Sequence, residues 1–69
     1  MTIVLNGDPF EVAGPLTLTA LLAQLKIDPR RVAVEHNLTV VKRADYEKTH
    51  VHDGDEIEIV NFVGGGSRS

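Results

Sequence analysis

The chain contains no cysteine and no tryptophan, and aromatic residues make up only 4% of it. The lack of cysteine excludes disulfides, zinc knuckles, iron–sulfur ligation and a thiol nucleophile. Its 69 residues amount to one small domain, and a domain of this size buries only about 60% of its unfolded surface. A deep active site is hard to build in that volume, so we expect the chemistry to involve partner proteins.

Positive charge and long apolar runs are also scarce. Lys and Arg number 7 against 10 Asp and Glu, a net charge of −3, whereas non-specific nucleic-acid binding needs a basic surface. No apolar run approaches the roughly 18 residues that span a bilayer, and the first residues lack the layout of a signal peptide. We therefore expect a cytoplasmic protein that binds neither nucleic acid nor membrane.

Turn signals separate several short β-rich segments. Asn6-Gly7 lies between two apolar runs and predicts a hairpin with a type I′ turn. The second strand is expected to begin only at Phe10, because Pro9 has no N–H. Further strands are predicted at 32–35, 38–41 and 56–63, turns at 36–37 and 53–55, and a loop or single helical turn at 42–48.

One amphipathic helix is predicted after the first hairpin. Its apolar stripe has the spacing i, i+3, i+4 and i+7, at Leu18, Leu21, Leu22 and Leu25. Thr17 can cap its first N–H groups, and Asp28-Pro29 closes the segment because a residue before proline avoids the helical region. One helix on one face of a small sheet gives a two-layer α+β domain, whose other face is open to solvent or a partner.

A glycine run, Gly64, Gly65 and Gly66, precedes the last three residues. Composition alone favours a flexible linker, since Gly/Ser tails behave as random coil. The functional alternative depends on the missing Cβ atoms: a glycine pair can thread a narrow channel and present an ionised terminal carboxylate to a nucleotide phosphate. The run follows a predicted strand directly, which suits a presented end. We divide the chain into a domain at 1–63 and a tail at 64–69.

The last strand predicts an exposed apolar spot beside this tail. Ile57 and Ile59 share one face of the strand, and Val60 and Phe62 share the other. If the isoleucines face the helix, Val60 and Phe62, together with Val63, are candidates for binding a partner. The alternative is a twist or bulge that lets Phe62 fill the edge of the core.

The other polar groups have simpler interpretations. His50 and His52 lie close in sequence but have no cysteine nearby, so we predict no metal site, and His36 is expected to be structural or exposed. The acidic segment 53–58 lacks the spacing of a calcium loop, although it could steer the chain onto a basic partner. No nucleophile–base pattern appears, and the glycine run lacks the residues of a phosphate-binding loop. We do not expect an enzyme.

The order and spacing of these elements resemble the ThiS sulfur carriers of thiamine biosynthesis, in the ubiquitin-like β-grasp superfamily. The resemblance covers nearly the whole chain. The matching segments are Asn6-Gly7, the capped helix 17–25, the segment 32–37, Val41-Lys42-Arg43, the run 53–59 and the ending 63–66.

The resemblance implies a mixed sheet of four to five strands, with the last strand inserted beside the first and one main helix on one face. It implies that the carboxylate of Gly66 is adenylated with ATP by a ThiF-like adenylyltransferase. The adenylate would become a thiocarboxylate, with sulfur drawn from cysteine through a desulfurase or sulfurtransferase. A ThiG-like thiazole synthase would receive the sulfur. No cofactor is expected to bind the carrier itself.

The triplet Ser67-Arg68-Ser69 departs from the family pattern, in which chains usually end at the second glycine. Either a protease removes these residues, or they are an artefact of the sequence, or the protein is not charged as it stands. Trimming after Gly65 is a further alternative, because three glycines leave the register ambiguous. The site of adenylation and thiocarboxylate formation is therefore predicted at Gly66 after removal of the triplet.

Three other functions share part of the pattern. A MoaD-like small subunit of molybdopterin synthase, or another sulfur donor, would use the same tail chemistry. A covalent protein modifier would join its terminal glycine to lysines. A non-covalent binding module would leave the tail unused.

Overall fold

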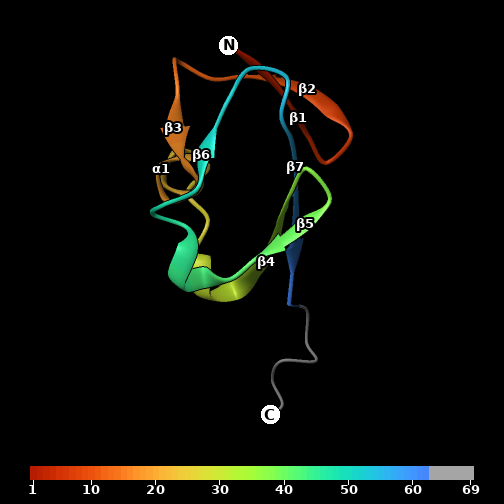
Figure 1. Ribbon diagram of the computed structural model, residues 1–69. Helices are drawn as coiled ribbons and strands as arrows, with labels where there is room; N and C mark the ends of the chain where they lie inside the picture. Colours follow the sequence, from red (N-terminus) through yellow and green to blue (C-terminus); the bar gives the residue numbers. More distant parts are fainter. Residues whose placement is uncertain (63–69) are drawn as a thin grey trace.

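Five strands form one mixed sheet, and a single helix covers one of its faces (Figure 1). The computed structural model describes residues 1–62. The strands of this sheet are β1 (Thr2–Leu5), β2 (Asp8–Glu11), β4 (Val32–His36), β5 (Thr39–Val41) and β7 (Glu56–Asn61). The remaining elements are β3 (Leu16–Thr17), β6 (His50–Val51), α1 (Leu18–Gln24) and two 3-10 helices, η1 (Pro29–Arg31) and η2 (Arg43–Asp45).

The last strand occupies the centre of the sheet, whose order is β2-β1-β7-β4-β5. It pairs in parallel with β1 and antiparallel with β4. This arrangement confirms the expected insertion beside the first strand. It also fixes the two faces of β7, because Ile57 and Ile59 lie opposite His36 and Val34 on the helix side.

The first hairpin has the predicted turn but begins its second strand earlier than predicted. Asn6 and Gly7 have φ values of 50° and 86°, as a type I′ turn requires. β2 begins at Asp8 and includes Pro9. Met1 and Val12 exchange both backbone hydrogen bonds, so the alternation of an antiparallel pair turns the nitrogen of Pro9 away from β1. An edge strand tolerates proline at such a position.

The helix begins as predicted and ends sooner. The hydroxyl of Thr17 accepts a hydrogen bond from the N–H of Ala20 at 3.1 Å. The end is a Schellman motif, in which the N–H of Ile27 bonds to the carbonyl of Leu22 at 2.9 Å. Lys26 adopts a φ of 59° at the position where glycine is usual. The chain reverses direction at Lys26, before Asp28-Pro29. The helix therefore ends earlier than the position of the proline predicted.

The β4–β5 connection is shifted by one residue from the prediction. The turn residues are Asn37 and Leu38, and β5 begins only at Thr39. Both the side chain and the backbone of Asn37 bind Glu56. The Oδ1 of Asn37 accepts a hydrogen bond from the N–H of Glu56 at 2.9 Å, and the N–H of Asn37 donates to the carbonyl of Glu56 at 2.8 Å. Leu38 consequently lies at a φ of 71°, with 81% of its surface exposed.

Replacing Leu38 by glycine is expected to stabilise the domain. A left-handed conformation costs a bulky L-residue roughly 1–2 kcal/mol, and an exposed side chain offers little packing in return. We expect Leu38→Gly to raise the free energy of unfolding by about 1 kcal/mol in urea titrations. Thr39→Gly, in the neighbouring strand, is the control and is expected to lower it. A loss of stability in Leu38→Gly would show that this leucine makes stabilising contacts.

The sequence predicted neither the two short strands β3 and β6 nor the burial of Tyr46. β3 and β6 pair antiparallel, with Leu16 opposite Val51. Each contributes only two residues, too few for a periodic signal. η2 lies within the polar segment 42–48, as predicted, and places Tyr46 in the core with 4% exposure. Burial raises the pKa of the Tyr46 hydroxyl.

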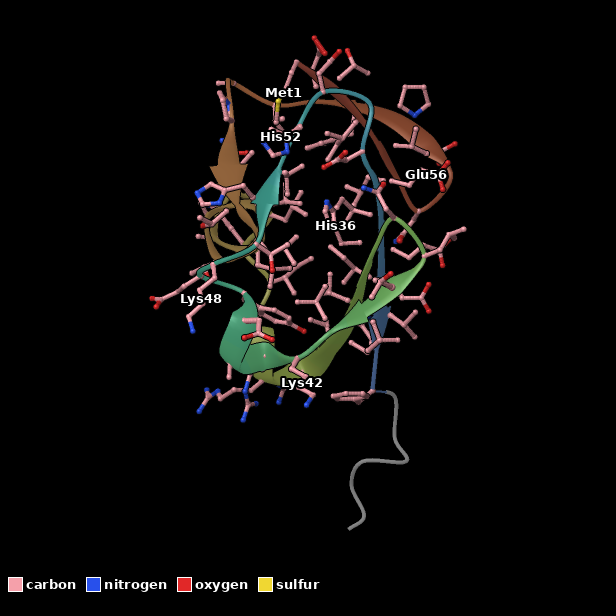
Figure 2. The ribbon with its side chains drawn as sticks, in the orientation of Figure 1. Met1, His36, Lys42, Lys48, His52 and Glu56 are labelled. Atoms are coloured by element: carbon pink, nitrogen blue, oxygen red, sulfur yellow. The ribbon has the colours of Figure 1, made fainter. Side chains whose placement is uncertain are left out.

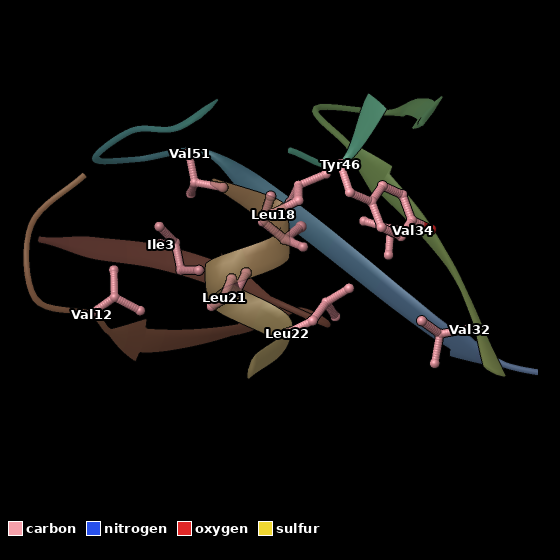
Figure 3. Packing of buried hydrophobic residues seen from close by; sticks show 10 residues of the cluster. Ile3, Val12, Leu18, Leu21, Leu22, Val32, Val34, Tyr46 and Val51 are labelled. Atoms are coloured by element: carbon pink, nitrogen blue, oxygen red, sulfur yellow. The ribbon is translucent and has the colours of Figure 1, made fainter. Parts of the chain in front are cut away.

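Ten buried residues form one cluster between the helix and the sheet (Figure 3). They are Ile3, Val12, Leu18, Leu21, Leu22, Val32, Val34, Tyr46, Val51 and Ile57. All five strands of the sheet contribute to this core or flank it, β5 through the partly buried Val41. Within residues 1–62, no helix is long and apolar enough to cross a membrane.

Candidate functional site

The open face is the face of the five-stranded sheet that points away from α1. Strand register assigns side chains to it, because directly opposed residues share a face. Val60 lies opposite Ala33, and Glu58 opposite Glu35, whereas their neighbours on β7 face the helix. The residues of the open face are Thr2, Val4, Pro9, Glu11, Ala33, Glu35, Val40, Glu56, Glu58 and Val60.

Val60 and Phe62 lie where the sequence predicted, outside the core at the end of β7. Their surfaces are 57% and 59% exposed. The N–H of Phe62 bonds to the carbonyl of Arg31 at 2.9 Å and continues the ladder with β4. The predicted alternative, a twist that buries Phe62 at the core edge, is therefore wrong. Whether these residues bind a partner stays a prediction.

The end of β7 extends past β1. The parallel pairing stops at Leu5 opposite Ile57. From there the side chain of Asn6 replaces a strand: its Oδ1 accepts from the N–H of Ile59 at 2.7 Å, and its Nδ2 donates to the carbonyl of Ile59 at 3.3 Å. Beyond this clamp, the backbone of β7 and Phe62 pairs only with β4 and Arg31 among the described residues. The sequence marked Asn6 only as a turn residue.

A shallow hollow of about 260 Å³ borders Phe62 at this end of the sheet. Its lining comes from η1, β4, β5 and the segment around η2, and includes Pro29, Val40 and Tyr46. The lining is mostly apolar. An exposed phenylalanine beside an apolar hollow has the character of a protein contact surface.

The acidic segment divides into structural and exposed groups. Asp53 accepts a hydrogen bond from the N–H of Thr2 at 2.8 Å. The carboxylate of Asp55 contacts Nε2 of His36 at 2.8 Å and accepts from the N–H of His52 at 2.8 Å. Figure 2 shows His36 on the helix side of the sheet, where it lies opposite Ile57. These contacts confirm His36 as structural and assign Asp53 and Asp55 to the fold.

Burial raises the pKa of Asp55, but hydrogen bonds from His36, the His52 N–H and Asn37, together with the charge of His36, outweigh it and hold this pKa below its ordinary value of 3.8. A carboxyl with a lowered pKa in the folded state stabilises the fold above its unfolded pKa. That contribution is lost as the pH falls from about 4 through the folded pKa.

Asp55→Asn is expected to lower the free energy of unfolding at pH 7 by about 1–3 kcal/mol, because charge-assisted hydrogen bonds to a half-buried carboxylate are lost. The difference from the unmodified chain should shrink at pH 3, where that chain also begins to lose the charge. Urea unfolding at both pH values measures this. Asp8→Asn, on an exposed position, is the control. An equal difference at pH 7 and pH 3 would contradict the role of the charge.

Among residues 1–62, no three His, Asp or Glu side chains gather in a geometry that could hold a metal ion. His50 and His52 are both exposed. The remaining predicted site residues, Val63, Gly64, Gly65 and Gly66, lie outside the described part of the chain, and so does the boundary predicted between domain and tail.

The sequence matches one known protein family over most of its length. A model described as the ThiS family matches residues 3–66. The chain belongs to the ThiS family. The match ends at Gly66, the residue at which the thiocarboxylate was predicted.

Solved structures and curated relatives agree with the ThiS assignment. A crystal structure of the thiamine biosynthesis protein ThiS from Geobacter metallireducens aligns with a TM-score of 0.85 and 40% identity, over 96% of this chain and 100% of that one. The sulfur carrier protein ThiS of Bacillus subtilis is 40% identical over 50 residues, which cover 72% of this chain and 76% of that protein. The ThiS assignment confirms the predicted ubiquitin-like β-grasp fold. The relative from Bacillus subtilis carries the name sulfur carrier protein, which is the role that the sequence predicted for this chain.

Some relatives are much longer proteins. A protein named thiazole synthase from Paramagnetospirillum magneticum is 46% identical over 67 residues, which are 97% of this chain but 21% of that protein. A second, from Magnetococcus marinus, shares 44% identity over 66 residues, 20% of its length. The ThiS chain therefore spans about a fifth of the length of these relatives.

Proposed function

We propose that this ThiS chain carries sulfur as a thiocarboxylate on Gly66, and that the end of β7 presents this residue to partner enzymes. The observation that carries the proposal is the position of β7. Its central placement anchors the strand in the sheet, while its last residues extend past β1 and lead directly into the glycine run.

The chemistry requires only a terminal carboxylate from this chain. An oxygen of the Gly66 carboxylate attacks the α-phosphorus of ATP, and pyrophosphate leaves. A sulfur nucleophile at the oxidation level of hydrosulfide then attacks the acyl carbon, and AMP leaves with the electron pair of the broken bond. The product is the thiocarboxylate. An adenylyltransferase supplies the nucleotide site. A desulfurase or sulfurtransferase takes sulfur from cysteine as an enzyme persulfide, and a thiol reductant releases that sulfur at the hydrosulfide level while the thiols are oxidised to a disulfide.

The acceptor we propose is a thiazole synthase. Support comes from the relatives that carry this name and contain a segment similar to this chain. Their name favours the thiamine pathway over molybdopterin synthesis, over covalent protein modification and over a passive binding module. Processing after Gly66 is part of the proposal, because the carboxylate otherwise belongs to Ser69.

A loading assay tests this function. A chain that ends at Gly66 is incubated with ATP, the adenylyltransferase of the same organism and a sulfur source, and its intact mass is measured. We expect a gain equal to the exchange of one oxygen for sulfur, followed by loss of that gain when thiazole synthase and its substrates are added. Chains that end at Gly65 and at Ser69 are the controls. Loading of the Ser69 chain, or of none of the three, would overturn the proposal.

The exposed apolar end of β7 is proposed to contact the adenylyltransferase. We expect Phe62→Asp to weaken this contact strongly while it changes the free energy of unfolding by less than about 1 kcal/mol, because Phe62 is 59% exposed. Phe62→Leu keeps an apolar side chain and should retain most of the binding. Binding is measured by titration calorimetry and stability by urea unfolding. Unfolding of Phe62→Asp would show instead that Phe62 supports the core.

A further inference from the structure

Two glutamates lie directly opposite each other in the middle of the open face. Glu35 on β4 and Glu58 on β7 are register partners, a position at which Cβ atoms are about 4.5–5.5 Å apart. Like charges in such a pair destabilise a sheet. In the described part of the chain, neither carboxylate has a basic side chain within salt-bridge distance.

Exposed valines border this pair. Val40 on the edge strand β5 lies directly opposite Glu35, and Val60 follows Glu58 by two residues on the same face of β7. Their surfaces are 68% and 57% exposed. Val40, Glu35 and Glu58 thus form one row across three adjacent strands, with Val60 beside it. None of these four side chains contributes to the core, so the row has no evident role in stability.

We propose that this row, Val40-Glu35-Glu58 with Val60, docks onto a protein surface that presents arginine or lysine side chains beside apolar ones, and that the surface belongs to thiazole synthase. The inference rests on the proposed function, which supplies that partner. Carboxylates that a partner covers must be paired, because an unpaired buried charge is costly. A guanidinium group can bridge two neighbouring carboxylates and relieve their repulsion.

Charge also argues against other occupants of the row. A second copy of the chain would bring the same pair of glutamates against itself in a symmetric contact. Nucleic acid and anionic lipid carry the same sign of charge as the row. Glu58 lies three residues before the end of β7 at Asn61 and about 7 Å along the strand from Val60, with Glu35 beside it on β4. Pairing them would therefore fix where the following tail enters the partner.

Association with thiazole synthase tests the inference. The protein is the chain that ends at Gly66, and the probe is the thiazole synthase of the same organism, titrated at low and at high salt. We expect the double variant Glu35→Gln/Glu58→Gln to bind at least about tenfold more weakly at low salt and to lose most of the salt dependence. Its stability in urea should be equal to or above that of the unmodified chain, because the repulsion is gone.

A matched control removes the same charge elsewhere. Asp8→Asn/Glu47→Gln changes two exposed acids whose side chains make no hydrogen bond or ion pair within residues 1–62, and we expect it to bind like the unmodified chain. Equal weakening in both double variants would overturn the inference in favour of a general charge effect. Unchanged binding of Glu35→Gln/Glu58→Gln would also overturn it.

The loading assay separates this inference from the proposed function. A chain that acquires sulfur but does not associate with thiazole synthase retains the carrier function and overturns the docking inference. A chain that neither acquires sulfur nor associates overturns both. Normal loading of Glu35→Gln/Glu58→Gln together with weakened association supports the inference specifically.

Discussion

Deletion of Gly65 and Gly66 from a chain that ends at Gly66 is expected to abolish sulfur loading and leave the fold intact. All ten core residues lie between Ile3 and Ile57, so the deletion removes none of them. Changes outside the core usually alter stability by less than about 0.5 kcal/mol, which corresponds to less than about 4 °C in the melting temperature of a domain this size. Intact mass after incubation with ATP, adenylyltransferase and a sulfur source measures loading, and calorimetry measures melting.

A substitution at Gly66 that keeps the chain length tests whether the reacting residue must be glycine. Gly66→Ala retains the carboxylate and adds one methyl group at the reacting residue. If the adenylyltransferase receives the tail through a narrow channel, this methyl group should slow loading strongly without changing the melting temperature. Loading of the Gly65-Gly66 deletion at the normal rate would contradict the assignment of the reactive end. A large fall in its melting temperature would show that the tail stabilises the domain.

The sequence was sufficient for elements with strong local signals. Asn6-Gly7 specifies its turn through backbone conformations that other residues avoid, and Thr17 specifies a helix start through its hydroxyl. The alternation in β7 predicted which side chains face the helix, so Val60 and Phe62 were placed correctly outside the core. Each of these signals acts within a few residues of the chain.

The features that the sequence missed depend on distant partners. Asn6 clamps Ile59 across 53 positions of the chain, and β3 with β6 form a pair of only two residues each. The Schellman end at Lys26 is also hidden, because lysine is not the residue that usually marks such a reversal. The opposition of Glu35 and Glu58 requires the register between β4 and β7, which no local pattern gives.

Ile57→Ala is expected to be the most destabilising single change on β7. Ile57 is 1% exposed and lies in the central strand between Leu5 and His36. Truncation of a fully buried isoleucine costs about 2–5 kcal/mol, and a 69-residue domain has a total stability of roughly 3–10 kcal/mol. A large share of the molecules should therefore unfold at moderate temperature. Urea unfolding followed by circular dichroism gives the loss directly.

Val60→Ala is the matched control, because it also replaces a β-branched residue of β7 by alanine and so carries a similar loss of strand preference. Val60 is 57% exposed on the opposite face, so we expect a change below about 1 kcal/mol. The difference between the two variants therefore reports mainly the burial of Ile57, together with the one additional carbon that its truncation removes. Equal destabilisation would mean that Val60 is packed in the fold, and the open face would then not be free to receive a partner. A small loss in Val60→Ala with weaker binding to the partner enzymes would show that one strand uses its two faces for separate purposes, with Ile57 holding the sheet on the helix and Val60 contacting the partner.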